Sequence, residues 1–247
     1  MTYCVGLLLD EGLVMLADTR TNAGMDNISV FAKLHVFHVP GERMISIMTA
    51  GNLAISQAVV NLIQDGLADP ETGAIQTIYN VPTMFRAAAL IGEAVRWVHK
   101  NHADAMRKQD VGFDVSILLG GQIAGRTLRL FNVYAAGNFI EATRDTPFLQ
   151  IGEHKYGKPI LDRAVNSTTT LTDGVKLALI SMDSTLRSNL SVGLPLDLLV
   201  YKRDELVAPV QRRICENDDY FLMIRERWSS ALREAHRNIP APDWALD

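Results

Sequence analysis

The chain has 247 residues and a net charge of −4, and 48% of its residues are hydrophobic against 21% charged. A chain of this length can bury a large core as one domain. Its basic residues form no long patch, which argues against nucleic-acid binding. It shows neither a signal-peptide pattern nor an apolar run approaching ~18 residues, so we expect a cytoplasmic protein without membrane contact.

The cysteine and histidine content offers little support for a metal site. Cys4 and Cys215 lie far apart without metal-ligand spacing, so we expect two reduced thiols. His99 and His102 stand three residues apart on an expected helix and could chelate a metal, but a third ligand is not evident and a solvated helix face is favoured. We therefore predict no metal and no cofactor.

The first half of the chain predicts two β-hairpins followed by two helices. Each hairpin joins apolar, strand-forming runs through a turn signal, Asp10-Glu11-Gly12 in the first and Pro40-Gly41-Glu42 in the second. A polar loop is expected between them over 19–29. Apolar residues then recur at helical spacing in two segments, separated by a loop over 68–80. The expected elements are strands 2–9, 13–18, 33–39 and 43–49 and helices 53–66 and 82–108.

The second half predicts a group of strands, two helices, two more strands and a terminal helix. Thr170 and Asp173 form a capping pattern at the start of the second of these helices. The expected elements are strands 115–120, 127–135, 138–142 and 148–152, helices 157–165 and 170–189, strands 196–201 and 210–215, and an amphipathic helix 217–237 with a tail 239–247.

This element order predicts an α+β fold. Strands in runs and helices in pairs argue against alternating βαβ units. Two antiparallel sheets packed face to face, with a helix pair on each outer face, account for the order. We expect a single domain over 1–247, which ends in a C-terminal helix and tail at about 217–247.

The start of the chain is a candidate catalytic centre. Removal of Met1 would leave Thr2 with a hydroxyl nucleophile and an α-amine base on one residue. The first hairpin pairs residues 2–9 with 11–18, so Thr2 and Asp18 are expected to be neighbours at its open end. Taken alone, a threonine at position two is common, and Asp18 could equally belong to a strand-end turn with a solvated ion pair.

Two further residues could complete this centre. Lys33 opens the next strand and would enter the same end if that strand lies beside the one that ends at Asp18. A lysine there would favour the alkoxide, and an aspartate would orient it. Gly51 lies at a strand-to-helix junction whose N–H groups could hold an oxyanion. Each alone is also compatible with an ordinary edge-strand lysine or turn.

The order of these motifs resembles the proteasome β-type subunits, which are N-terminal-nucleophile hydrolases. Within that group the chain is most similar to the bacterial Anbu (ancestral β subunit) family, by its opening, its length and its C-terminal helix and tail. The residues that carry the resemblance are the opening Met1-Thr2-Tyr3-Cys4-Val5-Gly6, then Ala17-Asp18-Thr19-Arg20, Lys33 and Thr49-Ala50-Gly51.

The resemblance implies a four-layer αββα sandwich and a threonine peptidase. It implies that Thr2 is the nucleophile and base, that Asp18 and Lys33 support it, and that the Gly51 amide stabilises the oxyanion. The implied assembly is a homo-oligomeric ring or helix that acts on a peptide or amide substrate. Any ATPase or accessory enzyme would be a separate chain.

The sequence departs from the proteasome pattern near the threonine amine. Ile151-Gly152-Glu153-His154 stands where the family has Gly-Ser-Gly, so Glu153 and His154 form either a new acid–base pair or a solvated turn. Where the family has an Asp and a Ser three residues apart on a helix, Thr185 and Ser188 match best, and the resemblance implies a catalytic role for Ser188. Asn189 or Ser191 could substitute for it.

Two other functions remain open from the residues. The site could cleave or transfer a specific small amide, which turnover of such an amide without degradation of unstructured proteins would indicate. Alternatively, the chain could be a catalytically silent ring-forming subunit, which retention of Met1 in protein from cells would indicate.

Overall fold

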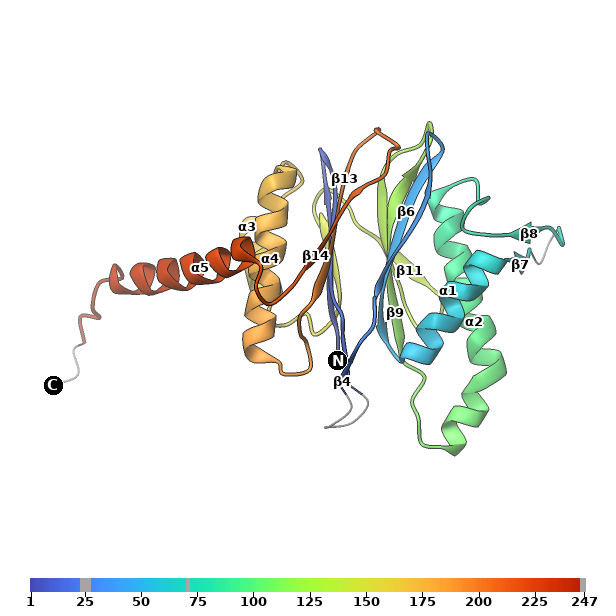
Figure 1. Cartoon of the computed structure of the whole chain (residues 1–247), viewed down its shortest axis with the longest axis horizontal. Coiled ribbons are helices and arrows are strands. Elements are labelled where there is room, and N and C mark those ends of the chain that lie inside the picture. The colour runs from blue at the N-terminus through green and yellow to red at the C-terminus, as the bar shows by residue number, and fades with distance from the viewer. Residues whose placement is uncertain (23–27, 70–71, 245–247) are drawn as a thin grey trace.

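The computed structural model describes residues 1–22, 28–69 and 72–244. It is a mixed α+β protein with two five-stranded antiparallel sheets, as predicted. Figure 1 shows the two sheets face to face in the middle of the molecule, with α1 and α2 outside one and α3 and α4 outside the other. The N-terminus lies at one end of the space between the sheets (Figure 1).

The first sheet carries the start of the chain at its centre. Its strand order is β12-β1-β2-β13-β14. Cys4 pairs with Ala17 and Leu9 with Gly12, which confirms the predicted hairpin. The strands are β1 (Tyr3–Leu9), β2 (Gly12–Asp18), β12 (Phe148–Gly152), β13 (Leu196–Lys202) and β14 (Val210–Ile214).

The second sheet has the order β11-β10-β9-β6-β5. Its strands are β5 (Leu34–Val39), β6 (Arg43–Gly51), β9 (Val115–Ile123), β10 (Arg129–Val133) and β11 (Phe139–Glu141). The premise that the strand following Lys33 lies beside the one ending at Asp18 is wrong. β2 is flanked by β1 and β13, whereas β5 pairs with its own hairpin partner β6 at the edge of the opposite sheet.

Two expected loops contain short hairpins. Strand β3 (Arg20–Asn22) lies within the predicted loop 19–29, and its partner β4 (Ile28–Val30) begins at the end of that loop. Strands β7 (Leu67–Ala68) and β8 (Ile75–Gln76) lie at the second loop. These strands are too short for the alternating apolar pattern that reveals longer ones. Residues 23–27 and 70–71 of these loops, and 245–247 of the predicted tail, lie outside the described residues.

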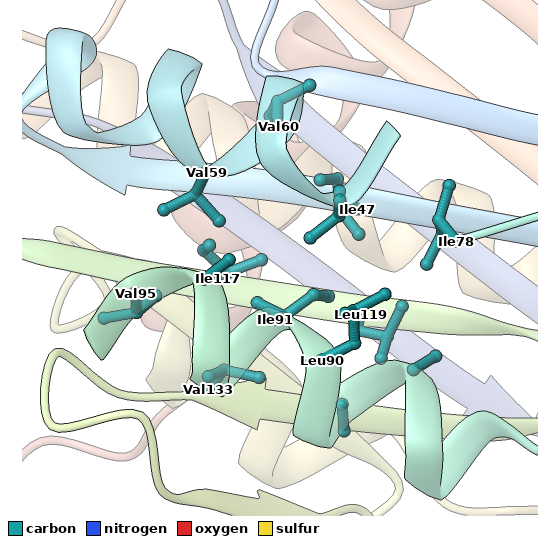
Figure 2. Close-up of a cluster of buried hydrophobic side chains, with 14 of the residues drawn as sticks. Ile47, Val59, Val60, Ile78, Leu90, Ile91, Val95, Ile117, Leu119 and Val133 are labelled. Atoms are coloured by element: carbon teal, nitrogen blue, oxygen red, sulfur yellow. The ribbon is translucent and has the colours of Figure 1, made fainter. Parts of the chain in front are cut away.

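Helices α1 (Leu53–Asp65) and α2 (Met84–Lys108) cover the second sheet. Asn52 and Thr83 cap their N-termini by accepting backbone N–H groups. Figure 2 shows how Val59 of α1 and Ile91 of α2 meet Ile117 of β9 in a fully buried apolar cluster. This packing anchors the start of α1, and with it the end of β6 at the candidate site.

Helices α3 (Lys158–Ala164) and α4 (Leu171–Ser188) cover the first sheet. The Thr170 hydroxyl accepts the Asp173 N–H, which confirms the predicted cap. The terminal helix α5 (Asp219–Arg237) packs against α4 through Phe221 and Ile224 and then extends away from the body (Figure 1). No helix in the described part of the chain is both long and apolar enough to cross a membrane.

Candidate active site

Thr2 is held at the mouth of the space between the sheets, with only 7% of its surface exposed. Its carbonyl oxygen accepts the Glu153 N–H at 2.7 Å. Gly152, the residue before Glu153, adopts φ +79°, and a Cβ on it would lie 1.9 Å from the carbonyl oxygen of Thr2. Only glycine allows this approach, so the turn after β12 positions Thr2. The sequence reasoning did not single out Gly152, although a glycine ending a strand was the available signal.

We expect Gly152→Ala to displace Thr2 and to lower both stability and any activity of the site. The new methyl group would overlap the Thr2 carbonyl and break the Glu153 hydrogen bond. Gly125→Ala is the matched control, because Gly125 has φ +69° with nothing within 4 Å of its Cβ position. Thermal denaturation measures the stability of both variants. An equal fall in Tm would show that the strain of an alanine at positive φ, and not a clash with Thr2, accounts for the effect at Gly152.

A buried ion pair lies beside Thr2. The Asp18 carboxylate is fully buried and Lys33 is only 4% exposed. Lys33 Nζ lies 2.7 Å from Asp18 Oδ1 and donates also to the Arg20 carbonyl at 2.7 Å. The same Oδ1 accepts the Tyr3 N–H at 3.1 Å. Asp18 therefore links Lys33 to the backbone N–H of the residue directly after Thr2. The predicted hairpin placed Asp18 in this region.

The Asp18–Lys33 pair joins the two sheets. Asp18 ends β2 in the first sheet, while Lys33 precedes β5 in the second. Asp18 Oδ2 accepts a further N–H, from Gly193 at 3.3 Å. Burial raises the pKa of the Asp18 carboxyl, and the opposing charge of Lys33 and the two N–H donors counteract part of that rise. Lys33 is thus a buried lysine at the start of an edge strand, not a solvated one.

Gly51 ends β6 with φ +103°, and a Cβ there would lie 2.3 Å from the Asp114 carbonyl oxygen. Successive N–H groups along a strand point to opposite edges. The Thr49 N–H donates to the Lys33 carbonyl on the β5 edge, and the Asn52 N–H donates to Asp114 on the β9 edge. The Gly51 N–H therefore points to the β5 side of β6. It lies beyond the first residue of β5, so a substrate oxygen could accept a hydrogen bond from it there.

Two cavities meet at Thr2. Both are bordered by Met1, Thr2, Ala50 and Gly51. The smaller, of about 60 Å³, is also bordered by Lys33. The larger, of about 550 Å³, extends towards the turn after β12. The structure thus brings three of the predicted residues, Thr2, Lys33 and Gly51, to one accessible space, and the fourth, Asp18, is buried behind them and paired with Lys33.

Solved structures of known proteins match the whole chain. It is 48% identical to Anbu (ancestral beta-subunit) from Yersinia bercovieri, with a TM-score of 0.89 over 99% of this chain and 100% of that chain. It is also 48% identical to the chain in a helical assembly of the Anbu complex from Pseudomonas aeruginosa, with a TM-score of 0.91 over 99% and 100%. The chain belongs to the Anbu family.

A third match agrees with this assignment. Anbu from Hyphomicrobium sp. strain MC1 is 48% identical, with a TM-score of 0.87 over 98% of this chain and 99% of that chain. No family model and no curated protein sequence matches. The resemblance to Anbu that the opening motifs indicated is confirmed at the level of the whole fold.

In this Anbu chain the helix-end residues implied by the proteasome pattern lie away from the cavities. Ser188 is exposed at the end of α4 and borders neither cavity at Thr2. Thr185 is buried and donates its hydroxyl to the Ser181 carbonyl within the same helix. The segment after α4 reaches the site instead through the Gly193 N–H to Asp18. The role of Ser188 stays a prediction without a contact to support it.

Glu153 and His154 both border the larger cavity, but they do not pair with each other. Glu153 Oε2 lies 3.6 Å from Lys155 Nζ, and His154 Nδ1 lies 3.1 Å from the Gly152 carbonyl oxygen. Among the described residues, no cluster of three or more His, Cys, Asp or Glu side chains could hold a metal. Cys4 and Cys215 are both free thiols.

A polar network that sequence reasoning missed lies next to Thr2. The Tyr3 hydroxyl is buried and lies 2.5 Å from both Ser181 Oγ and Gln150 Nε2. Burial raises the pKa of this phenol, so it remains protonated at neutral pH. The network ties β1 to β12 and α4, which holds the start of the chain against two elements far away in sequence.

Proposed function

We propose that this Anbu chain is an N-terminal threonine hydrolase that cleaves a peptide or related amide bond through an acyl-enzyme. The observation that carries the proposal is the buried Asp18 carboxylate, which contacts both Lys33 and the N–H of the residue after Thr2. A buried charge pair is costly unless it is well compensated. The Asp18–Lys33 pair lies beside Thr2, the residue that would hold both the nucleophile and the base. This position supports a catalytic use of the pair.

Removal of Met1 would free the Thr2 amine for the reaction. The amine takes the proton from Thr2 Oγ as Oγ bonds to the amide carbonyl carbon. The tetrahedral intermediate then collapses, the C–N bond breaks, and the amine passes its proton to the leaving nitrogen. Water next attacks the acyl carbon and gives its proton to the amine. The C–Oγ bond breaks, and Oγ recovers the proton as the acid is released.

Lys33 and Gly51 would stabilise charge during these steps. The Lys33 ammonium, which borders the same small cavity as Thr2, favours the alkoxide form of Oγ. The Gly51 N–H would donate to the carbonyl oxygen as negative charge develops on it. Asn52 caps α1 directly after this glycine, so the positive end of the helix lies beside the same oxygen.

We also propose that the fold is the four-layer αββα sandwich of N-terminal-nucleophile hydrolases and that the chain self-associates. The apolar cluster between the sheets and the clusters under each helix pair support that layer order. The helical assembly described for the Pseudomonas aeruginosa relative supports a homo-oligomer. A ring or helix of this chain would place many copies of the Thr2 site together.

The intact mass of protein made with its native start tests the proposal. We expect a mass that lacks Met1, followed by a single covalent addition from a peptide epoxyketone, which reacts with an N-terminal threonine through both its hydroxyl and its amine. Retention of Met1 in all of the protein isolated from cells would instead favour a silent structural subunit.

A further inference from the structure

The larger cavity at Thr2 is acidic. Of the described residues that line it, Asp114 and Glu153 carry carboxylates and none is a lysine or arginine. The smaller cavity has the opposite character, because Arg20 and Lys33 border it. Thr2 therefore lies between an acidic space large enough for a substrate side chain and a small basic one.

Asn132 gives the larger cavity an unused polar group. It lies on β10, on the same face as Leu130, which packs between the sheets, whereas Phe131 faces the helices. Only 8% of Asn132 is exposed, and its Oδ1 has no hydrogen-bond partner anywhere in the described part of the chain. Buried acceptors without partners are uncommon and costly. Asn132 borders the cavity, and a half-turn of its carboxamide would bring Oδ1 to a donor on a bound molecule.

The two carboxylates are available to a ligand. Asp114 has no ion-pair partner among the described residues, and its backbone carbonyl lies beside Gly51 at the end of β6. Glu153 lies 3.6 Å from Lys155, whose side chain is 66% exposed. An exposed pair at this distance is weak, so a cation entering the cavity can replace Lys155. His154 also borders the cavity.

We propose that the larger cavity binds a positively charged part of the substrate, a primary ammonium or a guanidinium group close to the amide bond that Thr2 attacks. Asp114 and Glu153 supply the charge, and the Asn132 carboxamide accepts a hydrogen bond. The inference rests on the proposed function for its meaning, because it names the substrate class of the same site. The cavity itself can be tested without catalysis.

Peptide binding to a Thr2→Ala protein tests the charge preference directly. Three probes differ in one side chain, acetyl-Ala-Lys-Ala-amide, its norleucine analogue and its glutamate analogue, and calorimetry measures their affinities. We expect the lysine peptide to bind about tenfold more tightly than the norleucine peptide, with a smaller difference at high salt. Equal affinities for all three peptides would overturn the inference.

Matched variants assign the preference to the cavity. Asp114→Asn and Glu153→Gln should each reduce the lysine preference several-fold, while Glu226→Gln, on the exposed face of α5, should leave it unchanged. A preference that survives both cavity substitutions would place the bound cation elsewhere and would contradict the proposal.

Asn132→Leu separates ligand binding from folding. Since Oδ1 has no partner, a leucine of similar shape should keep or raise Tm while it weakens binding of the lysine peptide. A lower Tm with unchanged affinity would assign Asn132 a structural role and would remove it from the proposal.

Failure of this inference and of the proposed function can be told apart. A wild-type protein that an epoxyketone labels, but whose Thr2→Ala form shows no charge preference, would retain the function and lose the substrate class. If labelling fails while the lysine peptide still binds preferentially and Asp114→Asn reduces this preference, the cavity is a cation site without threonine chemistry.

Discussion

Thr2→Ala is expected to abolish covalent labelling by a peptide epoxyketone and to lower any kcat/KM by at least ~10³-fold. The substitution removes the only hydroxyl that the proposed mechanism can use, while the small side chain still allows removal of Met1. Residue 2 is nearly buried and its backbone carbonyl bonds to Glu153, so the fold should persist. Intact mass after labelling measures the first effect, and light scattering checks that the assembly is unchanged.

Thr2→Ser is the matched control for this substitution. It keeps the hydroxyl and the amine on one residue and removes only the methyl group, so labelling should continue at a reduced rate. Labelling of Thr2→Ala to the same extent as the wild type would show that another nucleophile reacts. The assignment of Thr2 would then be wrong.

Lys33→Ala should cost about 3–5 kcal/mol of stability at neutral pH, because it leaves the Asp18 carboxylate buried without its partner. Chemical denaturation measures the loss. Lys100→Ala, at an exposed position near the end of α2, is the control and should change stability little. A loss no larger than that of the control would show that Asp18 is compensated by other groups.

The stability loss of Lys33→Ala should depend on pH. Burial raises the pKa of Asp18 above the 3.8 of an ordinary aspartate, and removal of the lysine charge raises it further. The folded state then holds this proton more tightly than the unfolded state. Its stability therefore rises as pH falls through the raised pKa towards 3.8. The variant should lie closer to wild type at acidic pH than at neutral pH.

A double variant can separate stability from activity at this pair. Asp18→Asn with Lys33→Met removes both charges and keeps side chains of similar length, so it should recover much of the stability that Lys33→Ala loses. It should not recover labelling of Thr2, because the ammonium that favours the alkoxide is absent. Recovery of both properties would mean that the charges serve the fold alone.

The secondary structure was largely readable from the sequence because its signals are local. Turn residues at Asp10-Glu11 and Pro40-Gly41 placed both hairpins. The pairing of Val39 with Arg43 agrees with the expected strand bounds, whereas Leu9 pairs with Gly12, one residue further along than the expected pairing of 2–9 with 11–18 implies. The helices followed from apolar spacing and caps such as Thr170. Boundaries were less accurate in polar loops, where β3 and β7 are only two or three residues long.

The sequence alone placed Asp18 beside the start of the chain, since one hairpin and a count of residues are enough, and Asp18 Oδ1 accepts the N–H of Tyr3, the residue after Thr2. Only the tertiary structure decided how Lys33 reaches them. It arrives from the opposite sheet, because β5 pairs with β6 and the two sheets then stack. The approach of Gly152 and Gly193 to this centre, and the position of Asn132 at its cavity, likewise arise from contacts between distant segments. Local patterns cannot encode such contacts, because they depend on how complete sheets and helices pack together.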